Sequence, residues 1–291
     1  MTSANARVGA VRPRRRFLAL LVLLAAATVA RTGVSLHAQI VAMRHANGQN
    51  VTPVFEGWYR NADGTVTISF GYLNRNYEEQ LDIPVGPNNR IDPQPLDQGQ
   101  PTHFLPRRQF GIFTVVVPKD FGDRTITWTL TANGGTASIA ASLKPMWEIG
   151  ALKDSTAGNT PPVVRFDPNG PSGQGPRGVS SAMSAPAHAG LPLSVWVTDD
   201  GVVSLQQAGR GPRLKLTWSH FRGAGQVVFD DARPSVGADG KALTTATFST
   251  PGEYVLRLLA NDYSGDGGGG TQCCWTNGYV KVTVAPQRSE P

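Results

Sequence analysis

The stretch TTATFSTPGEYVLRLLANDYSG, Thr244–Gly265, holds two strand-like runs joined by a Pro-Gly turn. Short runs rich in β-branched and aliphatic residues, bounded by turn residues, are typical of antiparallel sheets. The runs RLKLTWSHF, GQVVFDD, NGYVKVTVAP, LPLSVWVTDDG and PVVRFDP around it have the same character. Six or seven short strands between residues 163 and 287 predict a two-layer antiparallel β-sandwich in this part of the chain.

A second β region comes earlier, between residues 39 and 143. Alternating runs on either side of NADG, Asn61–Gly64, predict a β-hairpin. The segment Ile83–Pro106 is rich in Pro, Asn, Asp and Gln, which predicts a long loop or an irregular edge. Residues 144–162 read as a linker. We therefore predict an all-β chain with two antiparallel β-sandwich domains in tandem, at 39–143 and 163–287, after an N-terminal signal peptide.

The first 38 residues differ in composition from the rest of the chain. They carry six arginines and no acidic residue, which leaves 21 basic and 21 acidic residues in the remainder. A basic start, the apolar run FLALLVLLAAATVA and then small residues are typical of an export signal, too short for an ordinary membrane-spanning helix. We expect cleavage after Ala38, with Ala30 as an alternative. RRRFL, Arg14–Leu18, leaves the general secretory and twin-arginine routes both open.

Export places the mature protein in the periplasm or outside the cell. Its balanced charge gives no reason to expect nucleic acid as a partner, since the basic surplus lies in the cleaved segment. No later stretch is long and apolar enough to span a bilayer. The sequence does not predict an oligomeric state.

Residues Asn159–Val284 resemble the polycystic-kidney-disease-type (PKD-like) and related immunoglobulin-like domains of bacterial surface proteins. The resemblance rests on NTPPVV, LPLSVWVTDDG, LKLTWSHFRGAGQVVFDD, TTATFSTPGEYVLRLLANDYSG and the final VKVTV. It implies that Trp218 lies on a core strand and that Pro251, Gly252 and Tyr254 form a turn into the penultimate strand. Domains of this kind are mostly spacer, adhesion or assembly modules, so the resemblance implies a fold more than a function.

The only two cysteines, Cys273 and Cys274, are neighbours and precede Trp275. A bond between them encloses almost no chain, so it adds little of the usual loop-entropy stabilisation. Four interpretations remain open. The bonded pair stiffens a loop tip, or forms a rigid ligand-binding platform beside Trp275, or each cysteine bonds a partner chain, or free thiols bind a soft metal such as Cu(I). An oxidising compartment argues against lasting free thiols.

Asp262, Ser264 and Asp266 begin a pattern similar to a calcium-binding loop, in which alternating oxygen side chains surround a hard cation. The pattern is incomplete, because its twelfth position, where a glutamate is needed, is Cys273. The alternative is a polar turn held by Asp side-chain hydrogen bonds. No cofactor is required by the sequence, and calcium is the candidate metal.

Trp58 and Tyr59 are consecutive on a predicted strand, so alternation predicts that one of them points outward. An exposed aromatic ring can stack on a sugar, whereas a buried ring belongs to the core. Known catalytic motifs are missing, and the four histidines of the mature chain have no metal-ligand spacing.

We predict a non-catalytic exported protein that serves in adhesion or assembly, with the Cys273-Cys274-Trp275 segment as the candidate contact surface toward another cell-surface protein. The alternative is a secreted carbohydrate-binding protein, or an accessory protein of polysaccharide degradation. Solvent exposure of Trp58 and Trp275 separates the two, because stacking on a polysaccharide needs accessible rings.

Overall fold

The computed structural model describes residues 44–287 except 94, 156, 203–213 and 263–272. The predicted signal peptide, Ser264 and Asp266 lie outside these residues. Beyond Met43 the chain forms one compact unit. That unit holds two hydrophobic cores, each enclosed by β-sheets, which confirms the predicted all-β sandwich class. Within the described ranges, no helix is long and apolar enough to cross a membrane.

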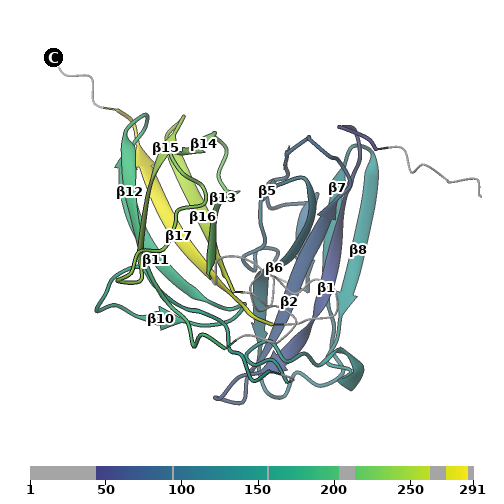
Figure 1. The fold of residues 1–291 in the computed structure, drawn as a ribbon. Coiled ribbons are helices and arrows are strands. Elements are labelled where there is room, and N and C mark those ends of the chain that lie inside the picture. Colours follow the sequence, from purple (N-terminus) through teal and green to yellow (C-terminus); the bar gives the residue numbers. More distant parts are fainter. Residues whose placement is uncertain (1–43, 94, 156, 203–213, 263–272, 288–291) are drawn as a thin grey trace, which may run out of the picture. The chain divides into compact units, whose positions relative to one another are not determined.

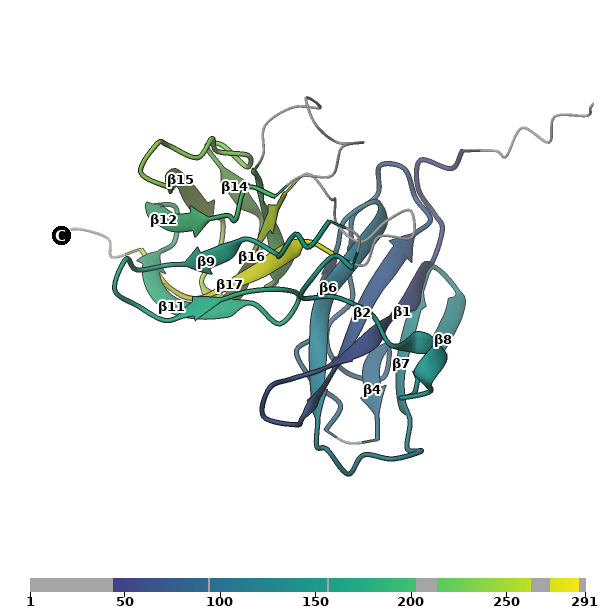
Figure 2. The same cartoon turned by 60° about the horizontal axis from the view of Figure 1, so that its bottom comes forward.

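The N-terminal sandwich packs a sheet of order β1-β2-β6 against a sheet of order β4-β7-β8, and β3 pairs with β5 (Figures 1 and 2). Its strands are β1 (Val51–Arg60), β2 (Val66–Asn74), β3 (Leu81–Asp82), β4 (Asn89–Asp92), β5 (His103–Phe104), β6 (Arg107–Val117), β7 (Ile126–Ala132) and β8 (Gly135–Ala141). The predicted hairpin at Asn61–Gly64 is confirmed, since β1 pairs with β2 as far as Arg60 and Val66.

Two short strands, β4 and β5, interrupt the segment that was predicted to be a loop or irregular edge. The polar residue Asn89 makes this possible, because it is buried and its side chain is fully used. Its amide donates to the carbonyls of Ile83 and Pro101 at 2.8 and 2.7 Å, and its oxygen accepts from the Trp128 indole at 3.0 Å. A polar segment thereby closes over an aromatic core without leaving buried groups unpaired.

The C-terminal sandwich has one sheet of order β10-β9-β12-β15-β14 and another of order β11-β17-β16-β13. The short 3₁₀ helix η1 (Pro145–Trp147) precedes it. Its strands are β9 (Val163–Arg165), β10 (Ser172–Gly173), β11 (Val179–Pro186), β12 (Gly190–Thr198), β13 (Lys215–Arg222), β14 (Val227–Phe229), β15 (Lys241–Phe248), β16 (Gly252–Asn261) and β17 (Trp275–Ala285). Among the described strands of this sandwich, β11 pairs with β17 in parallel, and the other pairs are antiparallel as predicted (Figure 2).

The strand order of this second sandwich is that of an immunoglobulin-like fold, with β9, β12, β15 and β14 opposite β13, β16 and β17. Trp218 lies on β13 and is buried in the core, as the resemblance implied. The Pro251-Gly252 turn leads into β16, where the Tyr254 hydroxyl donates to the Thr250 carbonyl at 2.8 Å. This bond fixes the corner at which the chain crosses from one sheet to the other.

Candidate functional site

The structure joins Cys273 and Cys274 in a disulfide, with Cα atoms 3.1 Å apart. Both cysteines are buried, and Trp275 is 1 % exposed. The prediction of a ligand-binding platform is therefore wrong, because the sulfurs and the indole are covered by the protein itself. The predicted bond between the two cysteines is confirmed, but the bonded pair lies in the interior at the start of β17. Bonds to a partner chain and a Cu(I) dithiol are also wrong, because neither thiol is free.

The disulfide lies against the segment that leads into the second sandwich. The sulfur atoms of Cys273 and Cys274 are 3.9 and 3.5 Å from the Asn159 carbonyl oxygen. The Asn159 side-chain amide donates to Asp262 Oδ2 at 2.7 Å, and the Asp262 amide donates to the Cys274 carbonyl. This cluster ties the start of β17 to residues 159–162, where the linker ends.

Asp262 is buried and its carboxylate accepts a hydrogen bond from Asn159, so this carboxylate has a structural role. Among the described residues, no group of three or more His, Cys, Asp or Glu side chains is placed to hold a metal ion. The calcium site stays a prediction, since Ser264 and Asp266 lie outside the described residues.

Trp275 packs on the N-terminal sandwich at Gly111 of β6. Opposite Gly71, strand β6 carries extra residues between Gln109 and Phe113, so the backbone bulges at this point. Gly111 has φ of +48°, and a Cβ atom there would overlap the Trp275 ring. The bulge and the missing side chain together make room for the indole. A glycine is therefore required for two reasons, the positive φ and the lack of space for a Cβ atom.

Asn277, two residues further along β17, connects both sandwiches by hydrogen bonds. Its buried side-chain amide donates to the Gly111 carbonyl at 2.8 Å and to the Pro176 carbonyl at 2.7 Å. Its oxygen accepts from Arg257 Nε at 2.9 Å. The amide therefore has both donors and its acceptor engaged, which fixes its orientation.

Arg257 is a buried cation on the outer face of the β11-β17-β16-β13 sheet, only 5 % exposed. Burial removes the water that hydrates a guanidinium group, which is unfavourable unless hydrogen-bond partners in the protein replace that water. Asn277 supplies one such partner, and Arg257 also hydrogen-bonds the Tyr279 hydroxyl. That hydroxyl donates to the Ile112 carbonyl of β6 at 2.8 Å. Burial raises the pKa of Tyr279 to about 12, so its hydroxyl stays protonated and able to donate.

Glu56 and Arg108 of the N-terminal sandwich lie beside Gly111. Arg108 donates to Glu56 Oε1 at 2.6 Å, and the same oxygen is 3.4 Å from the Gly111 amide. Both side chains are largely buried, and they lie over Gly71, where a side chain would collide with them. This ion pair thus lies beside Gly111, on which Trp275 packs.

A second contact lies at the β13 end of the sheet. Arg222 forms a bidentate ion pair with Asp97 at 3.0 and 2.8 Å, and its Nε donates to the Gln100 carbonyl at 2.6 Å. The bond from Arg222 holds the pKa of Asp97 below its usual value. Phe221, the preceding residue, packs in the core of the N-terminal sandwich, and its carbonyl accepts from the Thr102 amide.

Two histidines stack face to face beside this contact. The rings of His103 and His220 have centroids 4.3 Å apart and planes 23° apart. Nδ1 of His103 is 2.7 Å from Asp82 Oδ1, and Nε2 is 2.8 Å from Gln80 Oε1. Burial of the His220 ring lowers its pKa to about 4, and the nearby His103 acts in the same direction.

Trp58 and Tyr59 are both buried, so the prediction that one of them points outward is wrong. The two side chains do lie on opposite faces of β1, but both of these positions are covered by the protein. Trp58 packs in the core and donates to the Lys144 carbonyl at 3.0 Å. Tyr59 faces Arg177 of the second sandwich, and burial raises the pKa of its hydroxyl.

The candidate functional site is therefore the junction between the sandwiches. Trp275 was predicted to belong to the site, whereas the other junction residues Gly111, Asn277, Arg257 and Tyr279 were not. A signal was present in β16 and β17, where the outer-face positions Val255, Tyr279 and Trp275 are apolar or aromatic. A strand that is apolar on both faces indicates a sheet that is covered on both sides.

No family model matches the chain, and no curated protein matches it. Solved structures with some similarity include the D00-D0 domain of intimin, at 13% identity over 80% of this chain and 99% of that chain, with a TM-score of 0.27. Domains 4 and 5 of the S-layer protein SbsC are 11% identical over 81% of this chain and 98% of that chain, with a TM-score of 0.23. A chimeric titin Z1Z2 fragment is 11% identical over 82% and 100%, also with a TM-score of 0.23. Because superposition over the whole chain is this loose, the fold assignment rests on the strand order of the chain itself.

Replacing Asn277 by alanine is expected to lower the free energy of unfolding by about 2–4 kcal/mol, because a buried arginine and two carbonyls each lose a partner. Chemical denaturation of the two proteins measures this difference. Asn169→Ala is the matched control, since Asn169 is exposed in a turn and its side chain bonds to none of the residues that the structure describes. Equal stability of the Asn277→Ala protein and the wild type would contradict the role given to Asn277.

The stability of the protein is expected to fall as the pH drops from about 6.5 to about 4. The folded pKa of His220 is lower than its unfolded pKa, so only the unfolded chain takes up a proton in this window, and acid favours unfolding. The His220 contribution is of the order of 2 kcal/mol after allowing for partial exposure of the ring. Denaturation curves at several pH values should show a smaller acid loss for His220→Phe. A loss of the same size in both proteins would show that His220 is not responsible.

Proposed function

We propose that this chain is an exported, non-catalytic component of a cell-surface or extracellular assembly, in which two β-sandwiches act as one rigid unit. The observation that carries the proposal is the junction built on Arg257 and Asn277. Modules joined by a linker normally move relative to one another. Here the outer face of one sheet is covered by the neighbouring sandwich, so the two modules keep a fixed orientation relative to each other.

The linker supports the same conclusion, because it is bound to the first sandwich over part of its length. The Ile149 amide donates to the Trp58 carbonyl at 2.9 Å, and the Lys144 carbonyl accepts from the Trp58 indole. Further along, the Thr276 hydroxyl donates to the Pro162 carbonyl. Both ends of the linker are thus hydrogen-bonded to β-strands, which limits hinge motion.

The carbohydrate-binding alternative loses its physical basis. It required that Trp58 and Trp275 present accessible ring faces, and both are buried in the protein. The PKD-like relationship of residues 159–284 remains part of the proposal. It is supported by the position of Trp218 and by the turn before Tyr254, features that immunoglobulin-like modules share more widely.

Replacing Gly111 by valine is expected to uncouple the sandwiches, because a side chain there displaces Trp275 and breaks the bond between Asn277 and the Gly111 carbonyl. The wild-type protein should unfold in a single calorimetric transition, and the Gly111→Val protein in two. Small-angle scattering should show a larger radius of gyration for the variant.

Gly122→Val is the matched control, because Gly122 also has positive φ, at +60°, but its Cβ position is almost free of neighbours. It carries the backbone strain without touching the junction. Two transitions in the wild-type protein would show that the modules are independent and would overturn the rigid-unit proposal.

The export part of the proposal predicts a mature chain that begins at Gln39, found in the periplasmic or extracellular fraction. Cell fractionation followed by N-terminal sequencing measures both the location and the cleavage site. A chain recovered from the cytosol with its first residues intact would contradict export. This result is separate from the junction experiment, which depends only on the folded protein.

A further inference from the structure

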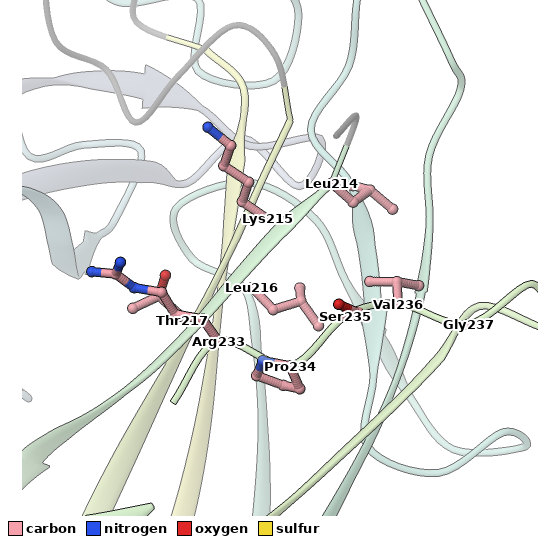
Figure 3. Close-up of a pocket in the computed structure, with 9 residues that line it drawn as sticks. All are labelled: Leu214, Lys215, Leu216, Thr217, Arg233, Pro234, Ser235, Val236 and Gly237. Atoms are coloured by element: carbon pink, nitrogen blue, oxygen red, sulfur yellow. The ribbon is translucent and has the colours of Figure 1, made fainter. Parts of the chain in front are cut away.

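A groove of about 560 Å³ runs along the edge of β13 in the second sandwich (Figure 3). One wall is the strand itself, over Leu214–Thr217, and the other is the segment Arg233–Gly237. The groove lies within one sandwich and does not involve the junction. Its volume falls in the range typical of ligand sites.

The β13 strand is at the edge of its sheet, so one row of its backbone groups is not paired with another strand. The Trp218 amide, on this row, donates to the Ala232 carbonyl at 2.8 Å. Backbone groups two residues apart point the same way, so the N–H and C=O of Leu216 also face the groove. In the described part of the chain, no hydrogen bond joins Leu214 or Leu216 to Arg233–Gly237.

The charged and the apolar side chains that line the groove lie on different sides of the strand. In Figure 3 the charged ends of Lys215 and Arg233 reach to one side of the strand, while Leu214, Leu216 and Val236 lie on the other. The lining contains two cations and no acidic residue. Among the described residues, neither cation forms a salt bridge.

We propose that this groove binds an extended segment of a partner protein, which adds to β13 as a further strand. Hydrogen bonds to the Leu216 backbone would hold the segment, as in other cases of strand addition. Successive side chains of a strand face opposite sides. The bound segment therefore alternates carboxylate side chains, which meet Lys215 and Arg233, with apolar side chains, which cover the partly buried Leu214 and Val236.

This inference gives the proposed assembly role a contact surface, but it does not depend on the rigid junction. The groove is formed by β13 and the segment before β15, so the Gly111→Val protein should keep it. Failure of peptide binding and failure of junction coupling are thus separate results.

The test uses the full chain and a labelled nonapeptide of alternating glutamate and valine with glycine at both ends. Fluorescence polarisation should show saturable binding, and a peptide with lysine in place of glutamate should bind at least ten-fold more weakly. The double variant Lys215→Glu, Arg233→Glu should reverse this preference. Lys119→Glu is the matched control, since Lys119 is exposed and outside the groove.

A second measurement needs no variant. Binding of the glutamate-valine peptide should slow hydrogen exchange of the Leu216 amide at least ten-fold. Three results would overturn the proposal. They are equal binding of the two peptides, binding that the double variant does not change, and a Leu216 amide already protected in a dimer of the free protein, which would mean that a second copy fills the groove.

Discussion

A positive charge that is almost completely removed from water governs the organisation of this molecule. Arg257 lies on a sheet face that would be solvated in an isolated sandwich, and its burial is favourable only if other groups replace the lost hydration. Asn277 and Tyr279 do so from the neighbouring strand, and they in turn bind the backbone of β6. Loss of one member removes a hydrogen-bond partner from buried groups of the others, so the network and the covered sheet face depend on each other.

This arrangement explains why the most unusual part of the sequence is not a surface feature. The Cys273-Cys274 disulfide lies where β17 begins, beside the Asn159 carbonyl and the Asp262 side chain. It fixes the start of the strand that carries Trp275, Asn277 and Tyr279 into the junction. The disulfide therefore helps to position β17, although it encloses almost no chain and adds little of the usual loop-entropy stabilisation.

Local patterns in the sequence predicted the all-β class and the hairpin at Asn61–Gly64, both of which depend on turn chemistry or on alternation within one strand. The resemblance to PKD-like domains implied the core position of Trp218. The burial of Trp58, Tyr59 and Trp275 depends on what covers a sheet face, which alternation does not specify. Arg257 carries a charge and is therefore expected to point to solvent, although its neighbours in VLRLLA are apolar on both faces. Only the contact with β6, far away in the chain, reverses that expectation.

The bond between Asn277 and the Gly111 carbonyl joins residues that are 166 positions apart in the sequence. Closing a loop of this length costs more chain entropy than pairing neighbouring strands, so we expect this contact to form late in folding. During folding, the Gly111–Ile112 surface of the first sandwich is consequently open to other molecules until β17 is in place. A partly folded chain with this surface uncovered is prone to aggregation.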